Sequence, residues 1–404
     1  MRSLATTRRY WLPQLGVLGL LALVGTLPFW LTGLDLQVAG RFYHPGADDP
    51  WFEAQAPLWH FFYQVAPLLS ALVMIGSLAV LVIGSFNRRL RPLRLYAVFL
   101  VAVSLLGPGL LVNQVFKEHW GRPRPYQVAE LGGAMAYLPP LMPGESGKGK
   151  SFPSGHSSVG FALIAFSLIW LRRRPWLAAA AMGVALALGG LLGAGRIVAG
   201  DHFLSDVIWS AVIVYGVALG LYYFVLRIPQ REDARASGPA GEFAPPRHPS
   251  LVLVGYALLG VVILAVALLV NPVSQDAILK LRPGLSPSVP RVLRLSADAA
   301  AVTLYSIPSE EDLAGQVRLR VRGFGLPTSR VEVSSETDGG VVEYRLRHVG
   351  VFTEKGVHVV IGIVPGAWER VEVRVESGDI QAQWMTDPKT VLDLVTGDGQ
   401  VSRP

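Results

Sequence analysis

Long apolar segments constrain this chain more than any other feature of its sequence. Charged residues make up only 16% of the 404 residues, against about 25% in soluble proteins. A helix needs roughly 20 mostly apolar residues to cross a bilayer. Seven segments approach or exceed that length, and they predict an all-α polytopic membrane bundle rather than a soluble fold. They lie at residues 12–34, 58–86, 95–116, 154–171, 176–195, 205–226 and 251–270.

Basic clusters alternate with these segments along the chain. The positive-inside rule places such clusters in the cytoplasm. The segments near 35–57, 117–153 and 196–204, and the chain after about 271, are then expected on the outer side. A cleavable signal peptide is the alternative for the first segment, but its apolar run is long and ends at Trp30 rather than at a small-residue cleavage site. The basic clusters are Arg8–Arg9, Arg88–Arg94, Arg172–Arg174 and Arg227 with Arg231.

The composition changes twice near the C-terminal third of the chain. Residues 228–250 are rich in Pro, Gly and charged residues, which predicts a cytoplasmic linker loop before a seventh transmembrane helix at 251–270. Beyond 271, apolar and charged residues alternate with period two, as in 317–322 and 370–375. This pattern predicts half-buried strands. We therefore expect a small all-β extracytoplasmic domain over 271–404, built as a sandwich or a solenoid.

Several polar residues recur at the outer ends of the predicted helices. Three cations among them could neutralise a phosphoryl group and its transition-state charge. Ser154 stands where a helix N-cap is expected, and the backbone near Gly155 could then present N–H groups to an anion. These residues predict a phosphate site on the outer side. They are Lys117, Arg124, Ser154, Gly155, His156, Arg196, His202 and Asp206.

The histidines supply the reactive groups of this site. His202 and Asp206 are spaced i,i+4, which puts them on one helix face if the sixth helix starts near Asp201. Asp206 could then hold the His202 ring and fix its tautomer, and His156 could protonate a leaving oxygen. The chain has no cysteine, which excludes thiolate metal sites. Three cations against one carboxylate disfavour a divalent ion, so no metal or other cofactor is expected.

The motifs Lys-x6-Arg-Pro, Pro-Ser-Gly-His and Arg-x5-His-x3-Asp resemble those of the type 2 phosphatidic acid phosphatase family, which shares its pocket with vanadium-dependent haloperoxidases. The resemblance covers about residues 55–227, and Gly195 stands where the family usually has Ser. It implies a six-helix phosphatase domain over 1–227 and metal-independent hydrolysis through a phosphohistidine. The implied roles are His202 as nucleophile, Asp206 as its partner and His156 as acid and later base, with Lys117, Arg124, Ser154, Gly155 and Arg196 binding the phosphate.

The predicted function is a phosphatase of the cell (inner) membrane that acts on its outer side. Candidate substrates are a polyprenyl diphosphate, phosphatidic acid, phosphatidylglycerol phosphate and a lipid A phosphate. The expected partners are this lipid and the bilayer, with a cell-envelope protein or polymer as a candidate partner of the β domain; no nucleic acid is expected despite the net charge of +7. A phosphotransferase using the same phosphohistidine remains an alternative. A lipid transporter or scaffold would place polar residues along the spans, whereas here they gather at one end.

Overall fold

The structure is a computed structural model that divides into two compact units, Met1–Ile263 and Leu264–Pro404. Each unit is described by itself. The described residues are 2–45, 50–133, 135–146, 149–237, 248–269, 271–280, 291–306, 316–326, 328–338, 340–363, 368–383 and 390–402.

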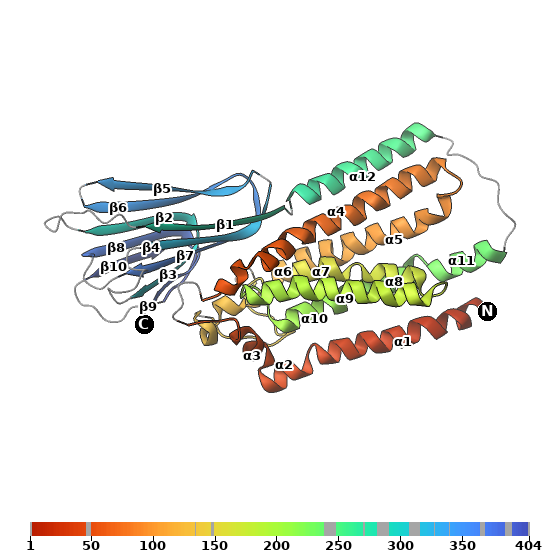
Figure 1. Cartoon of the computed structure of the whole chain (residues 1–404), viewed down its shortest axis with the longest axis horizontal. Helices are drawn as coiled ribbons and strands as arrows, with labels where there is room; N and C mark the ends of the chain where they lie inside the picture. The colour runs from red at the N-terminus through yellow and green to blue at the C-terminus, as the bar shows by residue number, and fades with distance from the viewer. Residues whose placement is uncertain are drawn as a thin grey trace. The chain divides into compact units, whose positions relative to one another are not determined.

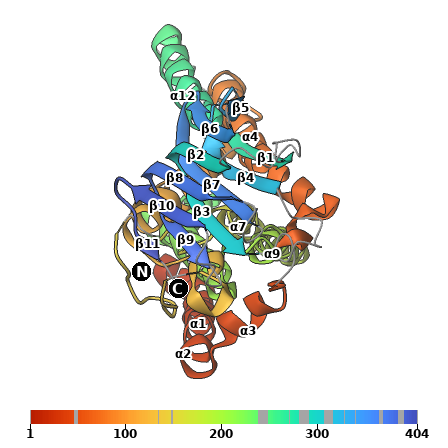
Figure 2. The ribbon, with the colours of Figure 1, turned by 90° about the vertical axis from the view of Figure 1, so that its left-hand side faces the viewer.

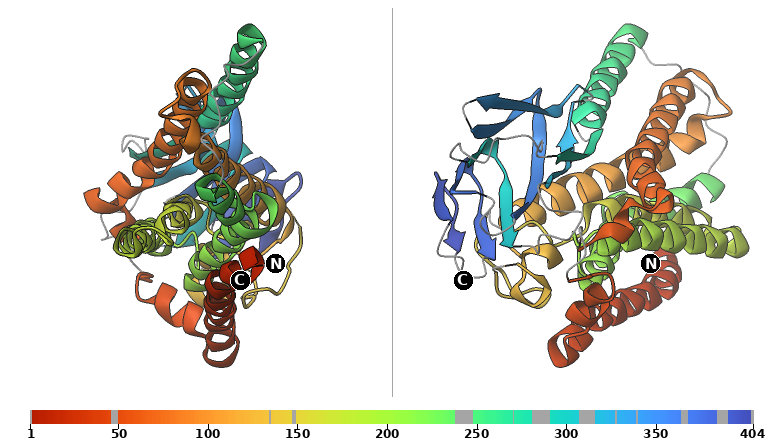
Figure 3. Two further views of the ribbon diagram at one scale, coloured as in Figure 1. Left: turned by 90° about the vertical axis from the view of Figure 1, so that its right-hand side faces the viewer. Right: turned by 60° about the vertical axis from the view of Figure 1, so that its left-hand side comes forward.

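The first unit is a bundle of apolar helices (Figure 1). Helix α4 packs against α5 and α9, and α1 packs against α10 (Figure 3). The helices are α1 (Arg2–Val24), α2 (Leu27–Thr32), α3 (Leu34–Gly40), α4 (Pro57–Phe86), α5 (Arg94–Ser104), α6 (Lys117–His119), α7 (Gly155–Phe161), α8 (Ile164–Trp170), α9 (Pro175–Val198), α10 (Leu204–Leu219), α11 (Ile228–Ser237) and α12 (Pro249–Leu269). Two π-helical segments, η3 (Leu105–Phe116) and η6 (Gly220–Val225), extend α5 and α10, and the short 3-10 turns are η1 (Phe52–Gln55), η2 (Arg91–Leu93), η4 (Pro125–Gln127) and η5 (Ala129–Leu131).

The apolar helices fall at the predicted segments, with two of them short. Among the described residues, five helical stretches are long and apolar enough to cross a membrane: Arg9–Thr32, Pro57–Phe86, Arg91–His119, Pro175–Val198 and Leu204–Ser237. The other two predicted segments form the shorter apolar helices Gly155–Trp170 and Pro249–Ala265. The first of these helices packs closely against α9. A Cβ added at Gly160 would stand only 2.5 Å from the backbone nitrogen of Gly189, so glycine at position 160 permits this close approach.

Part of the segment predicted as a linker loop is helical. Helix α11 occupies residues 228–237 and buries Glu232. Arg172, from the connection between α8 and α9, donates to Glu232 at 3.2 Å and to Asp233 at 2.5 Å. The loop prediction is therefore wrong for this part, because ion pairs to a distant basic cluster stabilise a helix that local composition does not indicate. Of the rest of the predicted linker, residues 238–247 lie outside the described residues, and helix α12 begins at Pro249.

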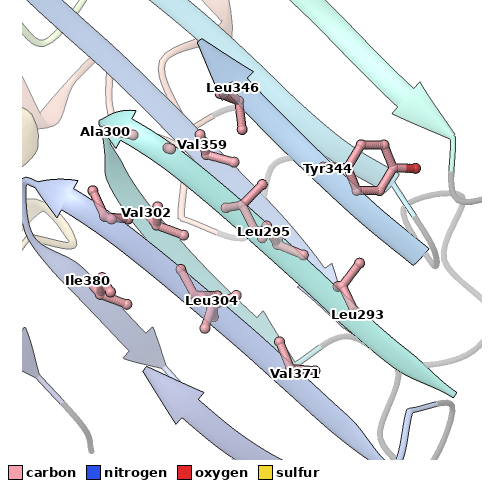
Figure 4. Close-up of a cluster of buried hydrophobic side chains, with 14 of the residues drawn as sticks. Leu293, Leu295, Ala300, Val302, Leu304, Tyr344, Leu346, Val359, Val371 and Ile380 are labelled. Carbon is pink, nitrogen blue, oxygen red and sulfur yellow. The ribbon is translucent and has the colours of Figure 1, made fainter. Parts of the chain in front are cut away.

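The second unit is all-β, as predicted, and contains two sheets (Figure 2). One has the strand order β1-β4-β7-β3-β9-β11 and the other β10-β8-β2-β6-β5. The strands are β1 (Asn271–Lys280), β2 (Val292–Ala299), β3 (Ala301–Ser306), β4 (Gln316–Gly325), β5 (Arg330–Asp338), β6 (Val341–Val349), β7 (Phe352–Ile363), β8 (Arg370–Ser377), β9 (Ile380–Gln383), β10 (Val391–Thr396) and β11 (Val401–Ser402). Apolar residues of both sheets form one core, which includes Leu295 of β2 and Leu304 of β3 (Figure 4).

The connections between the strands combine features of the two predicted architectures, the sandwich and the solenoid. Successive strand pairs β6–β7, β2–β3, β8–β9 and β10–β11 each pass from one sheet to the other, and each pairs in parallel with the next, as the rungs of a solenoid do. Antiparallel strands β5, β4 and β1 complete the sheets. At the corner between β8 and β9, Gly378 has φ +130, and a Cβ there would lie 2.2 Å from the carbonyl oxygen of Ala300. Only glycine fits this corner without strain.

Candidate active site

The predicted site residues converge at one end of the helical unit. Figure 1 shows α2, α3 and α6 at this end, and the N-terminus and α11 at the other. Each polar site residue is at most 7% exposed, although they come from segments far apart in the sequence. They are Lys117 on α6, Arg124 in the loop that follows it, Ser154 and His156 at the start of α7, Arg196 in the last turn of α9, His202 just before α10, and Asp206 in its first turn.

Asp201 joins the two predicted phosphate-binding arginines. Its Oδ1 lies 3.1 Å from Nη1 of Arg124, and its Oδ2 lies 2.9 Å from Nη2 of Arg196. Asp201 is itself only 4% exposed. Each guanidinium has five N–H donors, so one bond to Asp201 leaves most of them for other acceptors. The Nε atom of Arg196 is buried and has no hydrogen-bond partner among the described residues.

Tyr63 of α4 packs against two members of the site. The Arg196 guanidinium lies over its ring, 4.8 Å from the centroid. The His156 ring stacks on the same Tyr63, with 4.8 Å between centroids and an interplanar angle of 26°. The tyrosine thus orients one predicted phosphate ligand and the predicted acid. It lies in an apolar helix outside the motifs, and nothing in the sequence distinguishes it from a core aromatic residue.

A backbone carbonyl fixes the tautomer of His202. The ring Nδ1 lies 2.6 Å from the carbonyl oxygen of Ser151. Since a carbonyl can only accept a hydrogen bond, Nδ1 carries the proton and Nε2 carries the lone pair. Burial lowers the pKa of His202, and the positive charges of Arg124 and Arg196 act in the same direction, whereas Asp206 opposes them. His202 is therefore neutral at pH 7, with its lone pair on Nε2.

The expected direct hydrogen bond from the His202 ring to the Asp206 carboxylate is not formed. Helix α10 begins at Leu204 rather than near Asp201, so His202 precedes the helix and does not share a helical face with Asp206. Asp206 Oδ2 lies 3.9 Å from Nδ1 of His202, beyond hydrogen-bond range. The carboxylate instead accepts from the backbone N–H of Phe203 at 2.8 Å and from the Ser151 hydroxyl at 2.6 Å. Asp206 thus supports the ring through Ser151, which contacts both groups.

A buried arginine outside the predicted set holds Asp206. Arg122 is 0% exposed and donates to Asp206 and, at 2.8 Å, to Asp35 of α3. Its Nη1 also donates to the Ser205 hydroxyl and its Nε to the Leu138 carbonyl, both at 2.8 Å. Arg122 occupies the spacer of the first motif, where only its position beside Arg124 indicates proximity to the site.

Asp35 completes the contacts around Arg122. It accepts from the backbone N–H of Ser205 at 2.9 Å, from the Ser205 hydroxyl, and from the Tyr137 hydroxyl at 3.2 Å. Burial raises the pKa of Asp35, the Asp206 charge adds to this, and Arg122 opposes it. Burial alone would lower the pKa of Arg122, but the carboxylates of Asp206 and Asp35 outweigh it and raise that pKa. Arg122 is therefore a permanent cation shared by two buried carboxylates.

The second motif is tied to the third through its backbone. Ser154 is the N-cap residue of α7, as predicted. Its N–H donates to the Asp206 carbonyl at 3.2 Å, and its own carbonyl accepts from the Ser210 hydroxyl at 2.7 Å. Gly155 lies against η3, where a Cβ would stand 2.5 Å from Oδ1 of Asn113. Among the described residues, no cluster of three or more His, Asp or Glu side chains is placed to hold a metal ion.

The part of the chain that carries the motifs is similar in sequence to known proteins. A sequence model of the PAP2 superfamily matches residues 95–229, which contain the three motifs. The lipid A 4'-phosphatase of Francisella tularensis subsp. novicida (strain U112) is 36% identical over 206 residues, covering 49% of this chain and 90% of that protein. The lipid A 4'-phosphatase of Rhizobium leguminosarum is 37% identical over 121 residues, covering 29% of this chain and 51% of that protein.

A solved structure also aligns with part of the chain, at low similarity. The PAP2-type phosphatidylglycerolphosphate phosphatase from Bacillus subtilis is 19% identical, with a TM-score of 0.29, covering 56% of this chain and 98% of that one. The sequence matches define the class: this chain belongs to the PAP2 superfamily. It is a multi-pass membrane phosphatase, a phosphoric monoester hydrolase, with a C-terminal β unit.

Proposed function

We propose that this protein hydrolyses a phosphate monoester of a membrane lipid on the outer side of the cell membrane, through a phosphohistidine at His202. The observation that carries the proposal is the buried cluster of Arg124, Asp201 and Arg196 beside His156 and His202. Lys117 is buried at the same end of the helical unit (Figure 1). A site at that position admits a lipid headgroup while the acyl chains remain in the bilayer. Because two relatives are lipid A 4'-phosphatases, a lipid A phosphate is the favoured substrate.

The reaction proceeds in two displacements at phosphorus. In the first, Nε2 of His202 forms a bond to phosphorus as the bond to the lipid oxygen breaks, and His156 gives that oxygen a proton. In the second, His156 removes a proton from water, the water oxygen bonds to phosphorus, and the N–P bond breaks to release inorganic phosphate. The three cations and Ser154 bind the phosphoryl oxygens and stabilise their charge in both transition states.

The outward orientation is supported by the distribution of basic residues. Arg88–Arg94 and Arg172–Arg174 lie in connections between apolar helices, and the positive-inside rule places them in the cytoplasm. The motifs then lie in the periplasm, together with the β unit that follows α12. A reporter fused after Pro404 tests this orientation. Activity of a strictly periplasmic reporter is expected, and cytoplasmic behaviour would overturn the orientation.

Rapid-quench measurements on the purified protein in detergent test the mechanism. With a radiolabelled lipid phosphate, the wild type should accumulate acid-labile, base-stable label on protein, and His202→Ala should not. His156→Ala should still form this label from a substrate with a good leaving group, but should hydrolyse it slowly for want of a base. Exposed His119, which lies on the same side, provides the control His119→Ala, expected to behave like the wild type.

Two further results would overturn the mechanism. One is label that persists in His202→Ala, and the other is activity that disappears in chelator and returns with a divalent ion. Vanadate, which mimics the five-coordinate phosphoryl state, should inhibit. Product analysis with and without a lipid or sugar acceptor separates hydrolysis from phosphotransfer, because only hydrolysis releases all of the label as inorganic phosphate.

A further inference from the structure

We infer that Asp201 is a specificity-determining residue that makes the site selective for lipid phosphomonoesters over lipid diphosphates. This inference rests on the proposed function. Asp201 lies inside the spacer of the third motif and bridges Arg124 and Arg196, one carboxylate oxygen to each, at 3.1 and 2.9 Å. A carboxylate that is only 4% exposed and lies between two phosphate ligands subtracts one charge where the substrate binds.

The charges that face the substrate match a single phosphate group. Lys117, Arg124 and Arg196 contribute three positive charges around the phosphoryl oxygens, and Asp201 removes one, which leaves two. The proton on His156 is counted separately, because it passes to the leaving oxygen. Asp206 lies behind His202 and is paired with Arg122, so it adds little to this sum. A phosphomonoester carries about −1.5 to −2 at pH 7. A diphosphate ester adds at least one further ionised group, which the site does not neutralise.

The bridging geometry also limits how the arginines can turn. Arg196 is held on one side by Asp201 and on the other by the ring of Tyr63. Arg124 is held through Asp201 and through its backbone N–H, which donates to the Gln127 side chain at 2.9 Å. Neither guanidinium can turn to bind a second phosphoryl group without breaking its bond to Asp201. The net charge of the site and the fixed positions of both guanidinium groups therefore favour a substrate with a single phosphate group.

A matched pair of substrates tests the inference. Phosphatidic acid and diacylglycerol diphosphate can be prepared with the same acyl chains and differ by one phosphoryl group. Each is labelled on its terminal phosphate and assayed in the same detergent micelles. The wild type should have the higher kcat/KM for phosphatidic acid. In Asp201→Asn the ratio of the two kcat/KM values should shift toward the diphosphate by about tenfold or more, because one buried charge next to the bound anion is removed.

The controls separate charge from structure. Asp201→Glu keeps the charge and should keep the preference for the monoester even if kcat falls. Glu130→Gln removes an exposed carboxylate from the loop after Arg124 and should leave the ratio unchanged. If Asp201→Asn has too little activity to assay, its thermal stabilisation by inorganic pyrophosphate relative to inorganic phosphate should rise above that of the wild type.

Each outcome has one reading. If the full-length wild type hydrolyses no lipid phosphate, the proposed function fails. If the wild type is active and Asp201→Asn slows both substrates equally, with no change in anion preference, Asp201 has only a structural role and the inference is wrong. A shifted ratio in Asp201→Asn together with an unshifted ratio in Asp201→Glu supports it.

Discussion

Replacement of Arg122 with methionine removes a cation from the most deeply buried charge cluster of the helical unit. Arg122, Asp35 and Asp206 each have side chains that are 0% exposed. Methionine keeps the apolar stem of the side chain, but it is shorter and uncharged, and it leaves both carboxylates without their shared cation. The side-chain positions of Asp206 and Ser151, and therefore the support of His202, depend on that cation.

The expected cost follows from the two ion pairs. Loss of one partner from a buried pair costs about 3–5 kcal/mol, because a buried charge is left uncompensated. Arg122 serves two carboxylates, so Arg122→Met should lower the free energy of unfolding by about 5 kcal/mol, the upper end of that range. Asp35→Asn keeps the shape and leaves the Arg122–Asp206 pair, and should cost about 1.5–3 kcal/mol, the value of a hydrogen bond to a charged group. The double variant should cost less than the sum, because it leaves one unpaired carboxylate rather than two.

Unfolding in mixed detergent and SDS micelles, followed by circular dichroism, measures these differences. Arg41, an exposed arginine directly after α3, provides the matched control Arg41→Met, expected within about 0.5 kcal/mol of the wild type. The reasoning is refuted if Arg122→Met costs less than 1 kcal/mol, on the order of one ordinary hydrogen bond. It is also refuted if the Arg122 and Asp35 effects simply add.

Three other measurements test the site and the domain organisation. The folded-state pKa of His202 is lowered, so the stability that this group contributes is present above pH 6.5 and is lost as the pH falls below it. For the same reason, the single-turnover rate of phosphohistidine formation should begin to fall only below pH 6.5, where the His202 ring becomes protonated. Gly155→Ala places a methyl group against Asn113 and should reduce kcat at least tenfold by displacing the start of α7 by up to about 1 Å, whereas Asn113→Ala in the same chain should restore part of the loss. Removal of 272–404 should leave a bundle with phosphatase activity, because the described motif residues all belong to the unit Met1–Ile263; a folded but inactive truncation would contradict this.

The convergence of the motif residues could be predicted from the sequence alone. Each motif stands at the end of an apolar segment, and the alternation of basic clusters assigns those ends to one side of the membrane. Because a bilayer fixes the depth of each helix end, the position of a motif along the membrane normal follows from the order of the spans. Residues as distant in sequence as Lys117 and Arg196 can therefore be assigned to the same side without knowledge of helix packing. The buried positions of these residues agree with that argument.

Contacts that depend on local backbone geometry could not be predicted in the same way. The i,i+4 spacing of His202 and Asp206 favours a shared helical face, but Asp206 accepts from the Phe203 N–H and the helix begins only at Leu204. The tautomer of His202 is set by the backbone carbonyl of Ser151. Because every residue has such a carbonyl, the sequence does not indicate which one accepts this hydrogen bond. Alternating residues likewise predict strands, whereas their parallel order across two sheets depends on corners such as Gly378.

The N-terminal segment is part of the active-site architecture even though the PAP2 match begins at residue 95. Asp35 lies on α3, outside the match, and its carboxylate reaches both Arg122 and the first turn of α10. Arg122 in turn bonds Asp206, whose contact with Ser151 leads to the Nδ1 of His202. Each link in this chain is a charge-assisted or buried hydrogen bond, the kind that loses most when one partner is removed. The position of His202 therefore depends on α3 as directly as on the three motifs, and the functional unit of this phosphatase begins before the residues that its family model matches.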